Sequence, residues 1–154
     1  MVVEQGLNEP KLRPAGRVAA LLIALCAAAP LAIAATLTPA AQGMGTHVSL
    51  GLPACGWATM ADIPCPSCGM TTAFSWAARG DLSASFVAQP MGMVLAVAAG
   101  MTALAGLWAA ATGAAVQRPI GAAVLRGSVG WVVLGLLLAA WGWKMWTWNA
   151  GVTP

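Results

Sequence analysis

Three long apolar stretches divide the chain, at residues 17–37, 91–111 and 127–148. Each contains about the twenty residues that a helix needs to cross the hydrocarbon core of a bilayer. Charged and turn-forming residues gather mainly between these stretches. The pattern therefore predicts an all-α membrane protein with three transmembrane helices.

The segments between these stretches differ from one another in composition. Residues 1–16 carry both signs of charge and are predicted to form a short cytoplasmic tail. Residues 38–90 begin rich in Gly, Pro, Thr and Ser, which favour an irregular loop, and continue into an alanine-rich stretch with Phe74 and Trp76 that predicts a short interfacial helix. Residues 112–126 form a second loop. The chain is thus expected to be a single membrane domain.

The overall composition supports this class and argues against others. The chain is 60% hydrophobic and only 7% charged, which lies far outside the usage of soluble proteins. The net charge of +3 is small and dispersed, so a nucleic-acid partner is not expected. The sequence shows no phosphate-binding glycine loop, no paired catalytic carboxylates and no Ser/His/Asp set, which favours a non-enzymatic protein. The expected partners are the lipid bilayer and another membrane protein or a second copy of the chain.

The distribution of basic residues predicts an orientation in the membrane. Lys11 and Arg13 in the tail and Arg17 directly after it make three basic residues, and the second loop carries two, against one in the first loop and one near the C-terminus. This bias predicts a multi-pass protein of the bacterial cytoplasmic membrane with its N-terminus inside. The first loop would then face the oxidising outer side. Alternatively, the first stretch is a cleaved signal peptide with a cleavage site at residues 32–34.

The polar chemistry is concentrated in the first loop. Three of the four cysteines, Cys55, Cys65 and Cys68, lie there, together with the only histidine, His47. A long apolar protein that keeps its chemically active side chains in one short segment is expected to do its specific work in that segment.

The run Cys-Pro-Ser-Cys-Gly at residues 65–69 predicts a tight knuckle with two convergent sulfurs. Pro66 suits the first turn of a helix, and Gly69 tolerates a backbone conformation that other residues resist. We expect a helix from Pro66 or Ser67 to Ala78. Both sulfurs would lie at its positive end, which lowers a thiol pKa.

The same segment resembles an uncharacterised bacterial membrane-protein family, domain of unknown function 2752. Its signature is a cysteine, a gap of about nine residues, Ile-Pro-Cys-Pro-x-Cys-Gly-x-Thr-Arg, a Gly-Asp pair and an Asn-Pro pair. Besides the cysteines, the matching motif residues are Pro64, Pro66, Gly69, Thr71, Gly80, Asp81 and Pro90. The resemblance implies a small helical membrane protein and gives no activity. Thr72 replaces the family's arginine and Gln89 its asparagine, so a role that depends on that arginine is not expected here.

Gly80 is expected to end the interfacial helix before a further half-helix over residues 82–88. Arg79 and Asp81 flank this break. They either cap the two helix ends or pair with each other, and the sequence leaves both alternatives open.

Three further expectations concern the apolar stretches. Cys26 is expected to be a small buried residue. Gly92, Ala96 and Gly100 recur every fourth residue, which either offers a smooth stripe to a neighbouring helix or reflects only a richness in small residues. The tryptophans around Lys144 predict an anchor in the headgroup layer.

One hypothesis for the loop is a disulfide. Cys65 and Cys68 would pair with each other, or one of them with Cys55, as a staple or as a redox-active pair. In thioredoxin the proline precedes the second cysteine, whereas here it follows the first, and no βαβ pattern surrounds the motif. The staple is therefore favoured over the redox-active pair.

A second hypothesis is a metal site. Cys-Pro-x-Cys-Gly is similar to the knuckle of zinc ribbons and rubredoxins. Cys55, Cys65 and Cys68 with His47 would complete a tetrahedral Cys₃His set, for which zinc is the expected metal. Thioether sulfurs suited to Cu(I) are offered by the nearby methionines Met44, Met60 and Met70.

A third hypothesis is an interaction module, in which the cysteines only hold the loop in shape. The sequence favours a non-enzymatic membrane subunit or interaction module whose cysteine loop is tied by a disulfide or a metal. The alternative is a thiol redox or zinc- or copper-binding membrane protein whose cysteines act on the outer face.

Overall fold

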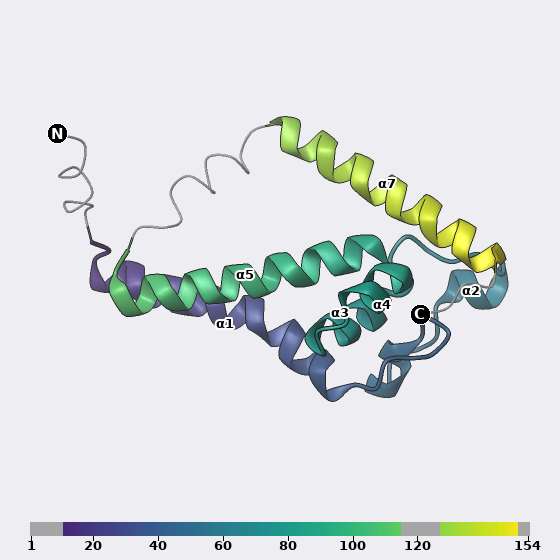
Figure 1. The fold of residues 1–154 in the computed structure, drawn as a ribbon, viewed down its shortest axis with the longest axis horizontal. Coiled ribbons are helices and arrows are strands. Elements are labelled where there is room, and N and C mark those ends of the chain that lie inside the picture. The colour runs from purple at the N-terminus through teal and green to yellow at the C-terminus, as the bar shows by residue number, and fades with distance from the viewer. Residues whose placement is uncertain (1–10, 115–126, 151–154) are drawn as a thin grey trace.

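The computed structural model describes residues 11–114 and 127–150. All of the regular structure in these ranges is helical (Figure 1). The elements are α1 (Pro14–Thr36), η2 (Thr46–Leu50), α2 (Gly56–Met60), α3 (Met70–Ala78), α4 (Leu82–Ala88), α5 (Pro90–Thr112) and α7 (Gly127–Ala150). The all-α prediction is confirmed for these ranges. The predictions for the first ten residues and for most of the second loop lie outside them.

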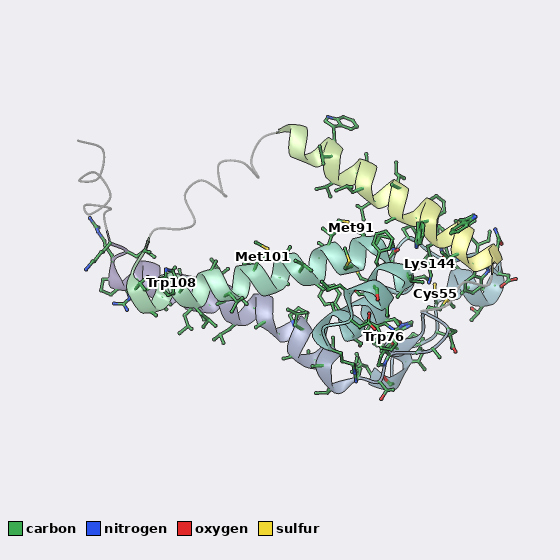
Figure 2. All side chains as sticks on the ribbon, viewed as in Figure 1. Cys55, Trp76, Met91, Met101, Trp108 and Lys144 are labelled. Atoms are coloured by element: carbon green, nitrogen blue, oxygen red, sulfur yellow. The ribbon has the colours of Figure 1, made fainter. Side chains whose placement is uncertain are left out.

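Helices α1 and α5 are each 23 residues long, and both are long and apolar enough to cross a membrane. In the most apolar 18-residue segment of α1 only 17% of the residues are buried in the protein, and in that of α5 only 22%. Met101 and Trp108, for example, project from α5 with 67% and 62% of their surface exposed (Figure 2). These helices coincide with the first two predicted spans. The third predicted span coincides with α7, and its crossing of a membrane stays a prediction.

Helices α1 and α5 lie side by side along much of their length (Figure 1). Small residues allow this close approach. A Cβ added at Gly106 would lie 2.9 Å from the carbonyl oxygen of Ala20 and 2.9 Å from the Cβ of Ala24. Nearer the start of α5, a Cβ at Gly92 would lie 2.8 Å from the Cβ of Ala73 in α3. The stripe predicted from small residues is therefore a packing surface, and Ala96 within it is buried.

Arg17 ties the beginning of α1 to the end of α5. Its Nε donates to the carbonyl oxygen of Ala110 at 2.7 Å, and its Nη2 donates to that of Ala111 at 2.6 Å. The last carbonyls of a helix lack partners within the helix, so the guanidinium satisfies them. The two helices are thus antiparallel, and residues 37–89 emerge together at their other end.

Helix α3 packs against α1, α4 and α5. It begins at Met70, so the prediction of a start at residue 66 or 67 was wrong. Residues 66–69 form a turn, because Gly69 has a left-handed φ of 88° that breaks the helical path. The position of this helix at a membrane interface stays a prediction. The predicted half-helix over residues 82–88 is confirmed as α4.

Arg79 and Asp81 serve the two helix ends at this break. Arg79 Nη1 donates to the carbonyl oxygen of Ser75 at 3.1 Å, within the last turn of α3. The carboxylate of Asp81 accepts from the backbone N–H of Ala84 at 2.9 Å and from Ser83 Oγ at 2.7 Å, at the start of α4. The capping alternative is therefore the one that the structure supports.

Replacement of Asp81 with alanine is expected to lower the melting temperature of the purified protein in detergent. Asparagine also caps helices well, so Asp81→Asn should lower the melting temperature much less. The Ala84 N–H, and then Ser83, lower the pKa of Asp81 below its ordinary value. A lowered folded-state pKa means that this stabilisation is present above the ordinary carboxyl pKa and is lost as pH falls through the folded one. The difference between wild type and Asp81→Ala should therefore shrink in acid. Equal melting temperatures for the alanine and asparagine variants would contradict the capping role.

Candidate metal centre

The sulfurs of Cys55, Cys65 and Cys68 lie within 4.8 Å of one another. The closest pair, Cys65 Sγ and Cys68 Sγ, is 3.1 Å apart, and all three are free thiols. The cluster lies where the knuckle meets α2, toward the C-terminal half of α7 (Figure 2). The three cysteines are close enough to hold one metal ion, as the sequence predicted.

Local backbone geometry makes the knuckle. The N–H of Cys68 donates to the carbonyl oxygen of Cys65 at 3.0 Å, which closes the turn around Pro66. The N–H of Cys65 in turn points at Cys68 Sγ at 3.2 Å. Gly69 follows in the left-handed conformation that a residue with a Cβ adopts only with strain. These bonds bring two sulfurs to one side of a four-residue turn.

Cys55 reaches the cluster from α2. Its carbonyl oxygen accepts from the N–H of Thr59 at 3.0 Å, so the short helix begins directly after it. The backbone N–H of Ala58 lowers the pKa of Cys55 to about 7. Burial, and then the neighbouring Cys65 thiol, raise the pKa of Cys68 to about 12. The expectation that a helix end lowers the pKa of both knuckle thiols was therefore wrong for Cys68, because α3 begins after it and the side chain is buried.

His47 stands apart from the thiol cluster. Its Nε2 lies 3.2 Å from the carbonyl oxygen of Pro53, and its side chain is half-buried. Among the ligand atoms of Cys, His, Asp and Glu that the structure describes, only those of the three cysteines form the cluster. A fourth-ligand role for His47 stays a prediction that requires the ring to leave Pro53.

A cavity of about 970 Å³ adjoins the cluster, and all three cysteines and His47 line it. Met44 and Met70, which the sequence offered as thioether donors, line it as well. Met60 does not line it and is 91% exposed. The lining also includes apolar residues from the last turns of α1 and the residue after it, namely Pro30, Ile33, Ala34 and Leu37.

Lys144 of α7 is the least expected member of the site. It is only 5% exposed, and its Nζ donates to the carbonyl oxygens of Gly43 at 3.2 Å and Ala88 at 3.0 Å. The same Nζ lies 3.3 Å from the position that a Cβ at Gly69, the residue after Cys68, would occupy. The interpretation of this part of the chain as a headgroup anchor was therefore wrong for Lys144, which points into the protein.

Two further side chains hold the backbone of the knuckle. Trp141 Nε1 donates to the carbonyl oxygen of Pro64 at 3.0 Å, and Gln89 Nε2 donates to that of Pro66 at 2.8 Å. Gln89 is fully buried. Sequence reasoning missed Trp141, Gln89 and Lys144 as parts of the site. The one available signal was a single lysine inside a long apolar helix, which marks a functional site by default.

The remaining motif residues have identifiable places. Pro64 is fully buried, Thr71 lines the cavity, and Pro90 occupies the first turn of α5. Gly80 has a φ of 84° in the link between α3 and α4. Thr72, which stands where the resembling family has arginine, is fully buried, and its hydroxyl lies 2.8 Å from that of Thr46. Cys26 is exposed on α1, so the expectation that it is buried was wrong.

Comparison with known proteins adds one match, over the region that contains this site. Residues 53–103 match the family described as "Protein of unknown function (DUF2752)". The resemblance noted in the sequence is thereby confirmed. The DUF2752 region begins just before Cys55, contains α2, α3 and α4 and ends within α5, so it covers about a third of the chain. No curated protein and no solved structure matches the chain.

Proposed function

We propose that this chain is a small multi-pass membrane protein in which Cys55, Cys65 and Cys68 hold a zinc ion. The observation that carries the proposal is the convergence of three thiol sulfurs within 4.8 Å from two separate segments. Thiolates are preferred ligands of zinc, and metal binding contributes directly to folding where a segment has little structure of its own. The zinc would tie the loop before α3 to the helices, which suits a non-enzymatic membrane subunit.

The charge of the surroundings supports a divalent ion. Three thiolates and Zn²⁺ carry a net charge of −1, which the buried Lys144 side chain would balance as an ammonium, because its Nζ lies 3.3 Å from the Cβ position of Gly69, the residue next to Cys68. With Cu(I) the same set would keep an uncompensated negative charge. Because a buried unpaired charge is costly, the balanced arrangement favours zinc over Cu(I).

Metal content of single variants tests the proposal. Protein purified without chelator or reductant is expected to hold about one zinc per chain, and serine at Cys55, Cys65 or Cys68 should each remove it, because a site reduced to two thiolates binds far more weakly. Cys26→Ser is the matched control, since Cys26 lies on α1 and is not part of the thiol cluster, and it should keep the metal. The measurement is metal analysis together with free-thiol counting.

A disulfide between Cys65 and Cys68 is the second candidate, because their sulfurs already lie 3.1 Å apart. It predicts a different result from the same experiment. The protein would contain no zinc and only two free thiols among its four cysteines, and Cys55→Ser would leave the disulfide intact. That outcome would rule out the zinc site.

We further propose that the loop faces the outside of a bacterial cytoplasmic membrane, with the N-terminus inside. This proposal is supported by the antiparallel pairing of α1 and α5, in which Arg17 and the end of α5 lie at one end of the helix pair and the thiol cluster lies toward the other end. The basic bias assigns the Arg17 side to the interior.

Labelling in intact cells checks this orientation. In a Cys26→Ser background treated with a zinc chelator, a membrane-impermeant maleimide near neutral pH should modify Cys55, which is half-exposed and has a pKa of about 7. The thiolate fraction rises with pH, so labelling should accelerate through neutrality, while the buried Cys68 should react last. Labelling that occurs only after cell lysis would reverse the proposed orientation.

A further inference from the structure

The thiol cluster supplies three protein ligands to a metal that prefers four. The described Cys, His, Asp and Glu side chains place no fourth ligand atom in the cluster, and His47 Nε2 instead contacts the carbonyl oxygen of Pro53. Structural zinc sites are closed by four protein ligands, whereas sites with three protein ligands keep an exchangeable position. The arrangement therefore has the composition of an open site.

The open side of the cluster faces a cavity that is large enough for a ligand. The cavity has a volume of about 970 Å³, within the range of small-molecule sites, and all three cysteines line it. Besides the thiols, its lining contains a few polar side chains, among them Thr71 and His47, and is otherwise mostly apolar. A metal at the cluster would therefore border a mostly apolar chamber.

The residues of α1 in the cavity lining indicate where a ligand would come from. Ile33 and Leu37 belong to the last turns of α1 and the residue after it, and α1 is apolar and long enough to cross a membrane. Ile33 lines the cavity and is 52% exposed, so the cavity is not sealed where α1 lines it. If α1 crosses a membrane, a ligand could enter from the lipid on this side.

Charge restricts the donor group of the ligand. Most of the residues that line the cavity are apolar, so a charged fourth ligand would lose hydration there without gaining enough polar partners. An uncharged nitrogen or oxygen donor avoids this cost.

We propose that the metal held by Cys55, Cys65 and Cys68 keeps an open fourth position that binds an uncharged nitrogen- or oxygen-donor molecule with a hydrocarbon chain, drawn from the bilayer into the cavity. This inference rests on the proposed metal site and adds its ligand. The donor atom binds the metal, and the chain lies along the wall formed by α1.

Cobalt-substituted protein makes the fourth position visible, because the visible absorption of Co²⁺ changes with its ligands. The full chain in detergent, loaded with Co²⁺, is titrated with 1-methylimidazole and 1-butylimidazole at about pH 8, where an imidazole is largely uncharged. Both should shift the absorption bands. The butyl compound should bind more tightly by up to about 60-fold, since each of its three additional CH₂ groups contributes about fourfold when buried.

A matched pair of variants on α1 distinguishes binding in the cavity from partition of the ligand into detergent. Ile33→Trp fills part of the cavity and should remove most of the additional affinity of the butyl compound, while Co²⁺ still binds. Ile23→Trp makes the same change at a residue of α1 that is 44% exposed and does not line the cavity, and it should keep the gain.

Three results would overturn the inference. Bound Co²⁺ with a spectrum insensitive to both imidazoles means that a protein side chain closes the site, and the zinc proposal survives. Equal affinity for both compounds means that the cavity does not receive the chain. Failure of Co²⁺ to bind removes the metal site and this inference with it.

Discussion

Replacement of Gly69 with alanine should lower the free energy of unfolding by about 3–5 kcal/mol, from left-handed strain and the loss of charge-assisted hydrogen bonds. Gly69 has a φ of 88°, and a Cβ there would lie 2.7 Å from the carbonyl oxygens of both Gly43 and Ala88. These are backbone atoms that cannot turn aside, and they are the two oxygens that accept from Lys144. The alanine would therefore push the knuckle away from three neighbours at once: the loop at Gly43, the end of α4 at Ala88, and Lys144 of α7.

Two other glycines provide the control for backbone strain alone. Gly51 and Gly80 have φ values of 79° and 84°, and a Cβ at either would meet nothing within 4 Å. Gly51→Ala and Gly80→Ala should therefore cost only about 1–2 kcal/mol. Thermal or denaturant unfolding in detergent, with zinc content measured in parallel, distinguishes the cases. If Gly69→Ala were no worse than the two controls, the crowded junction around Gly69 would not be a determinant of stability.

Replacement of Lys144 with methionine should cost about 3–5 kcal/mol in the zinc-loaded protein, the usual loss when one member of a buried charge pair is removed. Methionine fills similar space but donates no hydrogen bond to Gly43 or Ala88. It also leaves the negative charge of the zinc–thiolate cluster without its buried partner. The variant should therefore bind zinc more weakly, and the loss of stability should be smaller in metal-free protein, where Cys68, whose pKa is raised to about 12 by burial, is protonated.

The loss of stability caused by Lys144→Met in zinc-loaded and in metal-free protein distinguishes a charge role of Lys144 from a packing role. Melting temperatures of wild type and Lys144→Met are compared with and without zinc. Lys11→Met is the matched control, because Lys11 is exposed, and it should change neither temperature appreciably. A loss of the same size in both forms would show that Lys144 only packs and ties the backbone, and zinc selection would need another explanation.

Much of the architecture could be predicted from the sequence because it depends on local composition. Helices α1 and α5 follow from apolar stretches that contain few charges, and their bounds differ from the predicted ones by three residues or fewer. The convergence of Cys65 and Cys68 follows from their spacing around Pro66 and from Gly69, which close a turn with bonds between neighbours. These features involve residues close together in the chain, so a pattern read along the chain contains them.

The tertiary structure alone decided what surrounds the thiols. Lys144 meets Gly43 across 101 residues, and Trp141 meets Pro64 across 77. The hydropathy pattern does not show which carbonyl oxygens a distant side chain will reach. For this reason Lys144 and the tryptophans around it were predicted to form a headgroup anchor. The raised pKa of Cys68 likewise depends on burial by segments distant in sequence. The sequence by itself determined the three cysteines that converge and two helices that are long and apolar enough to cross a membrane. The packing of distant segments decided the charge and the enclosure of the site, because contacts between helices depend on the shapes of their surfaces in three dimensions.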